Sequence, residues 1–291
     1  MKAAGELDVA PGQRIRWRAE APVVLRRTGP ARVHLVQAAG GPLGGDQLEL
    51  RIRLAAGTEL TVATAAATVA QRGRPGSGPA SWTVIAELDE GARLHWLPEP
   101  TVVCDGAELH ATFRLTLAEG AAAVVREQVQ LGRHGQRGGR YRGVLAADYA
   151  GAALVRHTTL LDGADPALTG PAGTGGQRLV GTVLGAGTAV SAASALPGTS
   201  SGPSGGPLAA ALASGPPVGE CAGLRWARHE LAGPGWLLVA LGTDPVALSR
   251  VLCGSGSASG STGERGSDAA GPGGSDLGGP GGSAQAVPAA R

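Results

Sequence analysis

The chain has 291 residues, enough for one or two domains with substantial cores. Glycine (50) and proline (20) make up about a quarter of it, roughly twice the usual share, and aromatic residues only 3%, which excludes a long, continuous helical protein. Because 25 Lys and Arg residues nearly balance 23 Asp and Glu residues, there is no basic field for nonspecific binding of nucleic acid or an anionic membrane.

Strands that bury one face are predicted along most of the chain. Residues 48–54 alternate perfectly between apolar and polar side chains, and residues 109–117 alternate in the same way. This period of two is typical of half-buried β-strands. Shorter runs of the same type predict further strands at residues 14–18, 23–27, 82–88, 93–97, 121–131, 154–161 and 236–241.

A weak internal repeat of about thirty residues joins several of these strands. In each copy, a glycine with small neighbours separates two strands; the glycines are Gly57, Gly91, Gly120 and Gly151. Glycine suits the positive φ that tight turns require. Since one such unit cannot bury its own apolar face, we predict a mostly β fold of stacked sheets, resembling a β-helix, with a few short helices.

One of these helices is expected near the carboxyl end, at residues 244–252, where Asp244 would be the N-cap and Pro245 the first helical residue. Two segments rich in Gly, Ser, Pro and Ala, residues 197–217 and 254–291, bury too little apolar surface to offset the entropy of ordering. We therefore predict a single β domain over residues 1–253 with a low-complexity loop at 197–217, followed by a disordered tail. Residues 73–79 are expected to form an exposed loop.

Targeting and cysteine signals are weak. The amino terminus lacks the apolar run of about 7 to 15 residues of a signal peptide, and nowhere do about 18 apolar residues follow one another, which favours a cytoplasmic protein without membrane contact. Cys104, Cys221 and Cys253 are widely spaced, so neither a disulfide framework nor a thiolate zinc site is indicated.

Common catalytic motifs, such as a P-loop, a zinc-protease helix or a nucleophile elbow, do not occur in the sequence. The six histidines are scattered, and the polar neighbours of His110 and His157 favour solvated imidazoles over metal ligands. Glu127 is more informative because it interrupts an apolar strand. It either pairs with Arg126 or a cross-strand arginine on an exposed face, or it faces an internal polar channel where a divalent cation could find oxygen ligands.

An ordered set of five motifs resembles the urease accessory protein family UreD, also called UreH. The first is the glycine-rich segment of residues 40–46 (GGPLGGD), which ends in Gly44, Gly45 and Asp46 immediately before an alternating strand. The others follow in the family's order: residues 64–72 with Thr68 and Arg72, residues 94–100, residues 105–107, and Glu127 before Leu131, Gly132 and Arg133. The chain departs from the family pattern, losing polar or aromatic side chains, at Ala65, Val69, Ala70 and Gly139.

The resemblance implies a non-catalytic maturation factor. Members of this family bind apo-urease and, with UreF and the GTPase UreG, form the assembly that delivers nickel to the urease active site, with an internal route for the ion through UreD. On this interpretation Asp46, Thr68 and Glu127 line the route, Gly44 and Gly45 admit close backbone approach, and Arg72, Gly132 and Arg133 are structural. Nickel would bind transiently and no cofactor tightly, because a tight Cys/His cage would retain the ion.

Two other functions are compatible with the residues alone. A hydrolase using Asp46 and Glu127 as a carboxylate pair would hold them within ~10 Å of each other in an open cleft. A β-solenoid interaction module without a metal role would need only the repeat, and predicts an exposed strand ladder without a buried polar passage.

Overall fold

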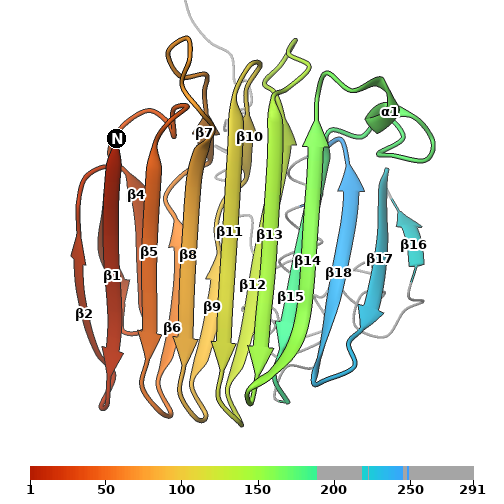
Figure 1. Cartoon of the computed structure of the whole chain (residues 1–291). Coiled ribbons are helices and arrows are strands. Elements are labelled where there is room, and N and C mark those ends of the chain that lie inside the picture. Colours follow the sequence, from red (N-terminus) through yellow and green to blue (C-terminus); the bar gives the residue numbers. More distant parts are fainter. Residues whose placement is uncertain (189–217, 222, 245–247, 249–291) are drawn as a thin grey trace, which may run out of the picture. The chain divides into compact units, whose positions relative to one another are not determined.

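The computed structural model describes residues 1–188, 218–221, 223–244 and 248. The described strands form a seven-stranded sheet and an eleven-stranded sheet, called here the front sheet and the back sheet (Figure 1). In spatial order the front sheet contains β14 (Ala152–Asp162), β13 (Arg140–Tyr149), β11 (Glu108–Leu117), β8 (Ala80–Leu88), β5 (Gln47–Leu54), β1 (Lys2–Ala10) and β2 (Arg14–Ala19).

The back sheet contains β16 (Val218–Cys221), β17 (Leu224–Glu230), β18 (Gly235–Gly242), β15 (Leu179–Ala186), β12 (Ala122–Leu131), β9 (Arg93–Leu97), β6 (Glu59–Thr64), β4 (Arg32–Gln37) and β3 (Val23–Gly29). Two short strands, β7 (Thr68–Ala70) and β10 (Thr101–Val103), extend it beside β12. The described helix α1 (Pro166–Thr169) follows β14.

The chain passes between the sheets in successive coils, so equivalent strands of neighbouring coils pair in parallel, as β5, β8, β11 and β13 do in the front sheet. Gly57, Gly91 and Gly120 lie in the crossing turns with φ of +66°, +68° and +75°. Each is the third residue of a turn closed by a backbone hydrogen bond, such as Ala92 N–H to Asp89 C=O at 3.0 Å. This geometry favours glycine.

The fourth predicted repeat turn differs from the other three. Gly151 (φ +80°) joins β13 to β14, which pair antiparallel within the front sheet. The repeat therefore predicts three sheet-crossing turns correctly, whereas the fourth glycine makes a hairpin that ends the series of coils. The local turn requires the same φ sign in both cases, so the sequence pattern does not distinguish them.

The hydrophobic core lies between the two sheets, where the alternating apolar residues of both sheets meet. One buried cluster combines front-sheet residues such as Ile52 and Phe113 with back-sheet residues such as Leu94 and Val125. The rings of Phe113 and Trp96 connect the layers with centroids 5.5 Å apart. A second cluster between the sheets includes residues of β10, β11, β12 and β13.

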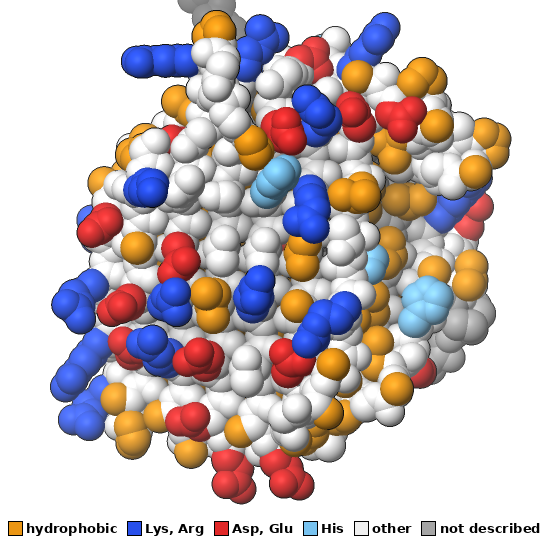
Figure 2. All heavy atoms as spheres, viewed as in Figure 1, with side chains coloured by type: hydrophobic (Ala, Val, Ile, Leu, Met, Phe, Trp, Pro, Cys, Tyr) orange, Lys and Arg blue, Asp and Glu red, His pale blue; other side chains and the backbone are white. Residues whose placement is uncertain are grey.

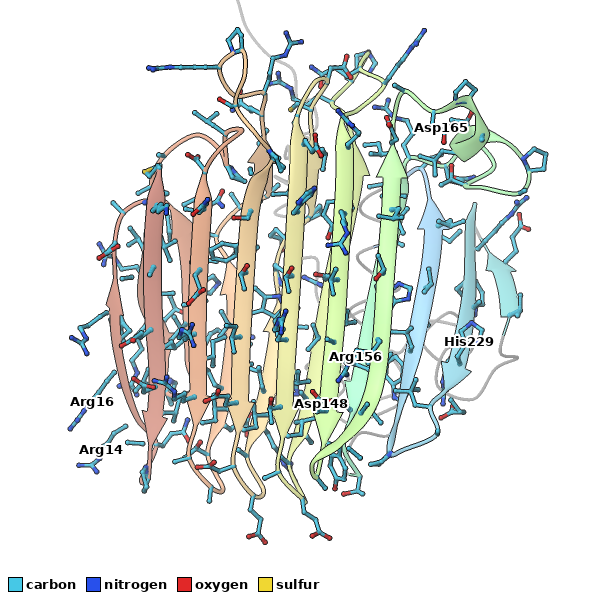
Figure 3. The ribbon with its side chains drawn as sticks, viewed as in Figure 1. Arg14, Arg16, Asp148, Arg156, Asp165 and His229 are labelled. Atoms are coloured by element: carbon cyan, nitrogen blue, oxygen red, sulfur yellow. The ribbon has the colours of Figure 1, made fainter. Side chains whose placement is uncertain are left out.

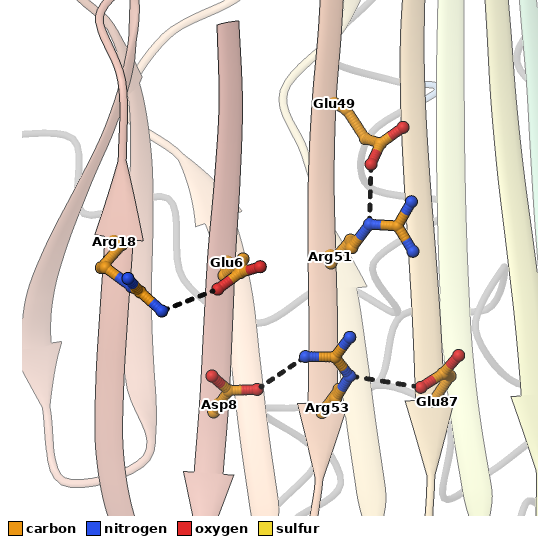
Figure 4. A network of polar contacts seen from close by, with 7 residues as sticks. All are labelled: Glu6, Asp8, Arg18, Glu49, Arg51, Arg53 and Glu87. Atoms are coloured by element: carbon orange, nitrogen blue, oxygen red, sulfur yellow. Dashed lines mark hydrogen bonds and ion pairs between the residues drawn. The ribbon is translucent and has the colours of Figure 1, made fainter.

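The outer faces of the two sheets differ. The front sheet exposes charged side chains (Figure 2), and Arg53 lies between Asp8 and Glu87 at 3.8 and 3.4 Å in a lattice of ion pairs (Figure 4). In the back sheet, β15 is buried along its whole length and β12 along most of it. Val124 on the outer face of β12 belongs to a third buried cluster with Trp226 and Trp236.

The predicted mostly β fold is confirmed, and a described strand overlaps each predicted one. Residues 73–79 form a largely exposed loop, as expected. Apart from Asp244 and Leu248, the predicted helix at 244–252 lies outside the described residues, as do the loop at 197–217 and the tail, so these boundaries stay predictions. Cys104 is a buried free thiol. None of the helices in the described part is long and apolar enough to span a membrane.

Candidate functional site

The back sheet is interrupted beside Glu127. Strand β12 pairs with β9 up to Val125 and with β10 from Val129 onward, so the parallel ladder is broken between these two residues. The Arg126 guanidinium donates hydrogen bonds across this interruption to the carbonyl oxygens of Leu97 and Pro98, at 3.3 and 2.8 Å. These hydrogen bonds hold the two sides of the interruption together. Glu127 lies on β12 midway along it.

Glu127 faces the space between the sheets. Val125 and Val129, two residues to either side of it, belong to the two interior clusters, and side chains two residues apart in a strand share a face. Arg126 points to the opposite face, so the proposed pairing of Glu127 with Arg126 is wrong. Thr182, the cross-strand partner of Glu127 in β15, is itself buried. Among the described residues, none donates a hydrogen bond to the Glu127 carboxylate or forms an ion pair with it.

Burial raises the pKa of Glu127 to about 7. Although protein surrounds the side chain, it is only partly buried and keeps some surface that water reaches. The pKa of Tyr141 in β13 is raised well above its ordinary value by burial and, secondarily, by the charge of Glu127. The Tyr141 ring folds over Gly143, where a Cβ atom would lie 2.8 Å from the phenol oxygen. The two sheets thus bring a carboxylate and a phenol together in the interior.

Thr68 lies on the far side of the interruption. It pairs with Thr101 and, through Thr101, with Val129, so Thr68 and Glu127 share the interior face of the back sheet. Their backbones are on the order of 12 Å apart by strand spacing. Thr68 also lines a pocket of about 350 Å³, whose other walls include Gly40, Gly41, Gln37, Gln71 and residues 64–67.

Asp46 holds the glycine-rich loop that borders this pocket. Its buried carboxylate accepts hydrogen bonds from the Leu43 backbone N–H at 2.9 Å and from the amino group of Met1 at 2.8 Å. Its carbonyl oxygen accepts from the Ser81 N–H at 2.7 Å. Asp46 is absent from the pocket lining, and its contacts position the loop; its predicted place on a nickel route stays a prediction.

The two residues before Asp46 are glycines for different structural reasons. A Cβ atom on Gly44 would lie 2.8 Å from the backbone nitrogen of Gly73, so the two chain segments meet only because no side chain separates them. Gly45 has φ of +85° and ordinary contact distances, so it serves the backbone conformation. The loop that follows β7 is thereby packed against the motif loop.

Comparison of the sequence with known proteins identifies a family. The sequence model described as "UreD urease accessory protein" matches residues 6–252. The chain belongs to the UreD family of urease accessory proteins. The resemblance found in the motifs is therefore confirmed, and membership supports a role in urease maturation.

Several relatives carry the name urease accessory protein UreD. The one from Frankia alni is 37% identical over 273 residues, covering 81% of this chain and 84% of the relative. The one from Parafrankia sp. is 38% identical over 272 residues, covering 85% and 84%. The one from Streptomyces coelicolor is 35% identical over 241 residues, covering 81% and 86%.

The remaining UreD motif residues shape loops at the same end of the sheets. The guanidinium of Arg72 lies against Gly106. A Cβ atom on Gly106 would be 2.6 Å from the Arg72 Nε atom. Gly132 has φ of +65° and donates its N–H to the Val103 carbonyl at 2.8 Å. Arg133 is exposed and contributes to the wall of the Thr68 pocket. The contacts of Arg72 and the backbone conformation of Gly132 fit the structural roles predicted for them, whereas Arg133 lines the pocket.

The departures from the UreD pattern fall into separate places. Ala65 and Val69 line the pocket, where their small side chains leave room, and Ala70 is buried in the interior. Gly139 packs so closely that a Cβ atom would lie 2.1 Å from the carbonyl oxygen of Ala107. A glutamate at Gly139 would therefore need a different backbone.

The geometry does not support Asp46 and Glu127 as a carboxylate pair. Burial is the cause of the raised pKa of Glu127, without a contribution from a neighbouring carboxylate, and Asp46 is occupied by its own loop. The sequence interpretation missed Thr182 and Tyr141. Thr182 is a lone polar residue in the apolar run of β15 and could have been recognised by the reasoning applied to Glu127, whereas the position of Tyr141 depends on how the sheets stack.

Proposed function

We propose that this chain is a non-catalytic nickel-delivery factor. Together with UreF and the GTPase UreG it binds apo-urease in the cytoplasm, and its interior provides a route along which Ni²⁺ passes to the urease active site. Membership of the UreD family supports the maturation role. The single observation that carries the nickel route is the Glu127 carboxylate between the two sheets, with no partner among the described residues.

A carboxylate in this position suits a passing divalent cation. Burial of an ionised group without a compensating charge is costly, and a cation would supply that charge. The hydroxyl groups of Thr182 and Tyr141 are the nearby polar groups, and the described residues contain no cluster of three or more His, Cys, Asp or Glu side chains suited to a metal ion. Such a set of ligands favours weak, exchangeable binding, which a conduit needs.

The same observation favours this function over an interaction module without a metal role. A module of that kind needs apolar interior faces and an exposed strand ladder, and an interior carboxylate would only lower its stability. The pocket lined by Thr68, a residue that shares the interior face of the back sheet with Glu127, gives the ion a place to enter or leave.

The test is co-expression of the chain with the urease subunits, UreF and UreG, followed by measurement of nickel per urease active site. Glu127→Gln keeps the size of the side chain but removes its charge, and we expect it to lower nickel content by about tenfold. Glu87→Gln is the matched control, because Glu87 lies on the exposed outer face of β8. Nickel content equal to wild type in Glu127→Gln would refute the route.

Co-purification separates assembly from transport. We expect Glu127→Gln to be recovered with UreF, UreG and urease in wild-type amounts, since Glu127 is interior. Failure of the unaltered chain to bind UreF and urease would overturn the proposed partnership, whatever the nickel content.

A further inference from the structure

The surroundings of Glu127 limit the directions in which an ion can leave it. Along the strand toward Val125, the interior is filled by the cluster that contains Leu94 and Phe113. Toward Val129 it is filled by the cluster that contains Leu109 and Leu161. Since both clusters are buried and apolar, an ion at Glu127 is closed off along the strand direction and must move across the strands.

Polar groups lie across the strands on both sides of Glu127: Thr101 and Thr68 on the side of β10 and β7, and a longer row toward β14. The Tyr141 phenol occupies the space over Gly143, and Gly143 pairs with Thr159 in β14. The Thr159 hydroxyl lies 3.1 Å from Nε2 of His157. His157 and Thr159 share the interior face of β14 with Leu161, which belongs to an interior cluster. A row of oxygen and nitrogen groups thus runs from Glu127 to His157.

Among the described strands, this row ends at an edge of the front sheet. Strand β14 is the last strand of the front sheet, whereas the back sheet continues through β18, β17 and β16. His157 and Thr159 are both half-buried, and the next strands of the back sheet present the exposed His229 on the same interior face (Figure 3). Figure 2 shows histidine and hydrophobic side chains gathered along this edge.

We propose that the nickel route has a sideways mouth at β14, where His157 and Thr159 bind the ion and exchange it with Glu127 past the Tyr141 phenol. The inference rests on the proposed function and adds a second metal-binding station to it. An imidazole nitrogen is a good ligand for Ni²⁺, and one imidazole with one hydroxyl binds weakly enough to release the ion. The sequence predicts a solvated imidazole at His157; its ring is half-buried beside the Thr159 hydroxyl, and the proposal gives it a ligand's role instead.

The experiment uses the complex of the full chain with UreF, UreG and urease, and two variants at the mouth. His157→Ala removes the nitrogen ligand, and Thr159→Trp fills the mouth with a large side chain. We expect either variant to lower nickel per urease site about tenfold. The controls are His110→Ala, at a half-buried position on the outer face of β11 paired with Glu108, and Thr158→Trp, on the outer face of β14; both should match wild type.

A binding measurement complements nickel content. Ni²⁺ alone, added to the purified complex, should protect His157 from diethyl pyrocarbonate, as read by mass spectrometry, and should leave His110 reactive. If Thr159→Trp does not fold, the nickel content of His157→Ala and the protection of His157 test the proposed mouth. Wild-type nickel content in His157→Ala, or no protection of His157, would overturn the mouth. If Glu127→Gln alone lowers nickel, the proposed function stands without it; if Glu127→Gln has no effect, both fail.

Discussion

The front and back sheets are built from the same coils but carry their polar groups differently. On the outer face of the front sheet, carboxylates such as Glu87 lie in water beside arginines such as Arg53. In the back sheet, both faces of β12 are largely buried, and its one carboxylate, Glu127, faces the interior. The comparison teaches that the role of a carboxylate in a strand depends on what covers its side chain. In water it is part of the protein surface, and between two sheets it is a candidate site.

The difference follows from what covers β12 and what covers the strands of the front sheet. A sheet with one face in water can place a charged residue at every second position, and the ion pairs there contribute little to stability. A strand covered on both faces, as β12 is, has no inexpensive position for a charge. Each prediction below alters one side of this contrast, starting with the largest expected effect.

The contact between the sheets should dominate stability. Phe113→Ala removes the ring that packs on Trp96 across the interior and should lower the free energy of unfolding by about 3 to 5 kcal/mol. Arg114→Ala, the next residue on the outer face of β11, should change it by less than about 0.5 kcal/mol. Urea unfolding of both variants measures this. Equal effects would mean that the two faces of β11 are not distinguished by burial.

The interior carboxylate should make stability depend on pH. The pKa of Glu127 is about 7 in the folded protein against an ordinary 4.5, so the folded state retains a proton that the unfolded chain has already lost. Stability is therefore fully present below about pH 4.5 and falls as the pH rises toward 7. Relative to Glu127→Gln, the wild type should lose on the order of 2 kcal/mol between pH 4.5 and 8, a value reduced for partial contact with water.

The measurement is the difference in unfolding free energy between the wild type and Glu127→Gln at several pH values, which cancels the titration of histidines common to both. Glu87→Gln, on the front sheet, should show no such trend against the wild type. A difference that stays constant from pH 4.5 to 8 would show that Glu127 is not buried as described.

The turns that connect the two sheets should have a smaller effect. Gly91 has φ of +68°, and a Cβ atom there would make only ordinary contacts, the nearest at 3.9 Å. Gly91→Ala should therefore cost about 1 kcal/mol through the backbone conformation alone. Glu90→Ala in the same turn provides the comparison for thermal unfolding. An equal loss in both variants would argue against a requirement for positive φ.

The outer lattice of the front sheet should have the smallest effect. Arg53→Gln breaks the contacts with Asp8 and Glu87, yet these groups are about half exposed, so the loss should be below about 1 kcal/mol. The loss should shrink further in high salt because exposed ion pairs are screened. A large loss that is insensitive to salt would show that the lattice is a main source of stability and would weaken the contrast between the sheets.

Much of the fold was predictable from residues close together in the chain. The alternation in residues 48–54 and 109–117 predicts β5 and β11, and Gly57, Gly91 and Gly120 mark the crossing turns. The hairpin at Gly151 has the same local sequence pattern, because its turn also requires a glycine with positive φ. Whether a turn crosses between sheets depends on the next strand's pairing, which is not a local property.

For the candidate site, the sequence by itself determined that Glu127 is unusual, that its neighbours are apolar, and that the ordered motifs resemble UreD. The tertiary structure decided that Glu127 faces the interior, that Asp46 holds a loop, and that Gly139 has no room for a side chain. It also decided which groups approach Glu127, namely Tyr141 and Thr182. The reason is physical: alternation distinguishes the two faces of a strand, but only register and stacking bring distant residues to one place.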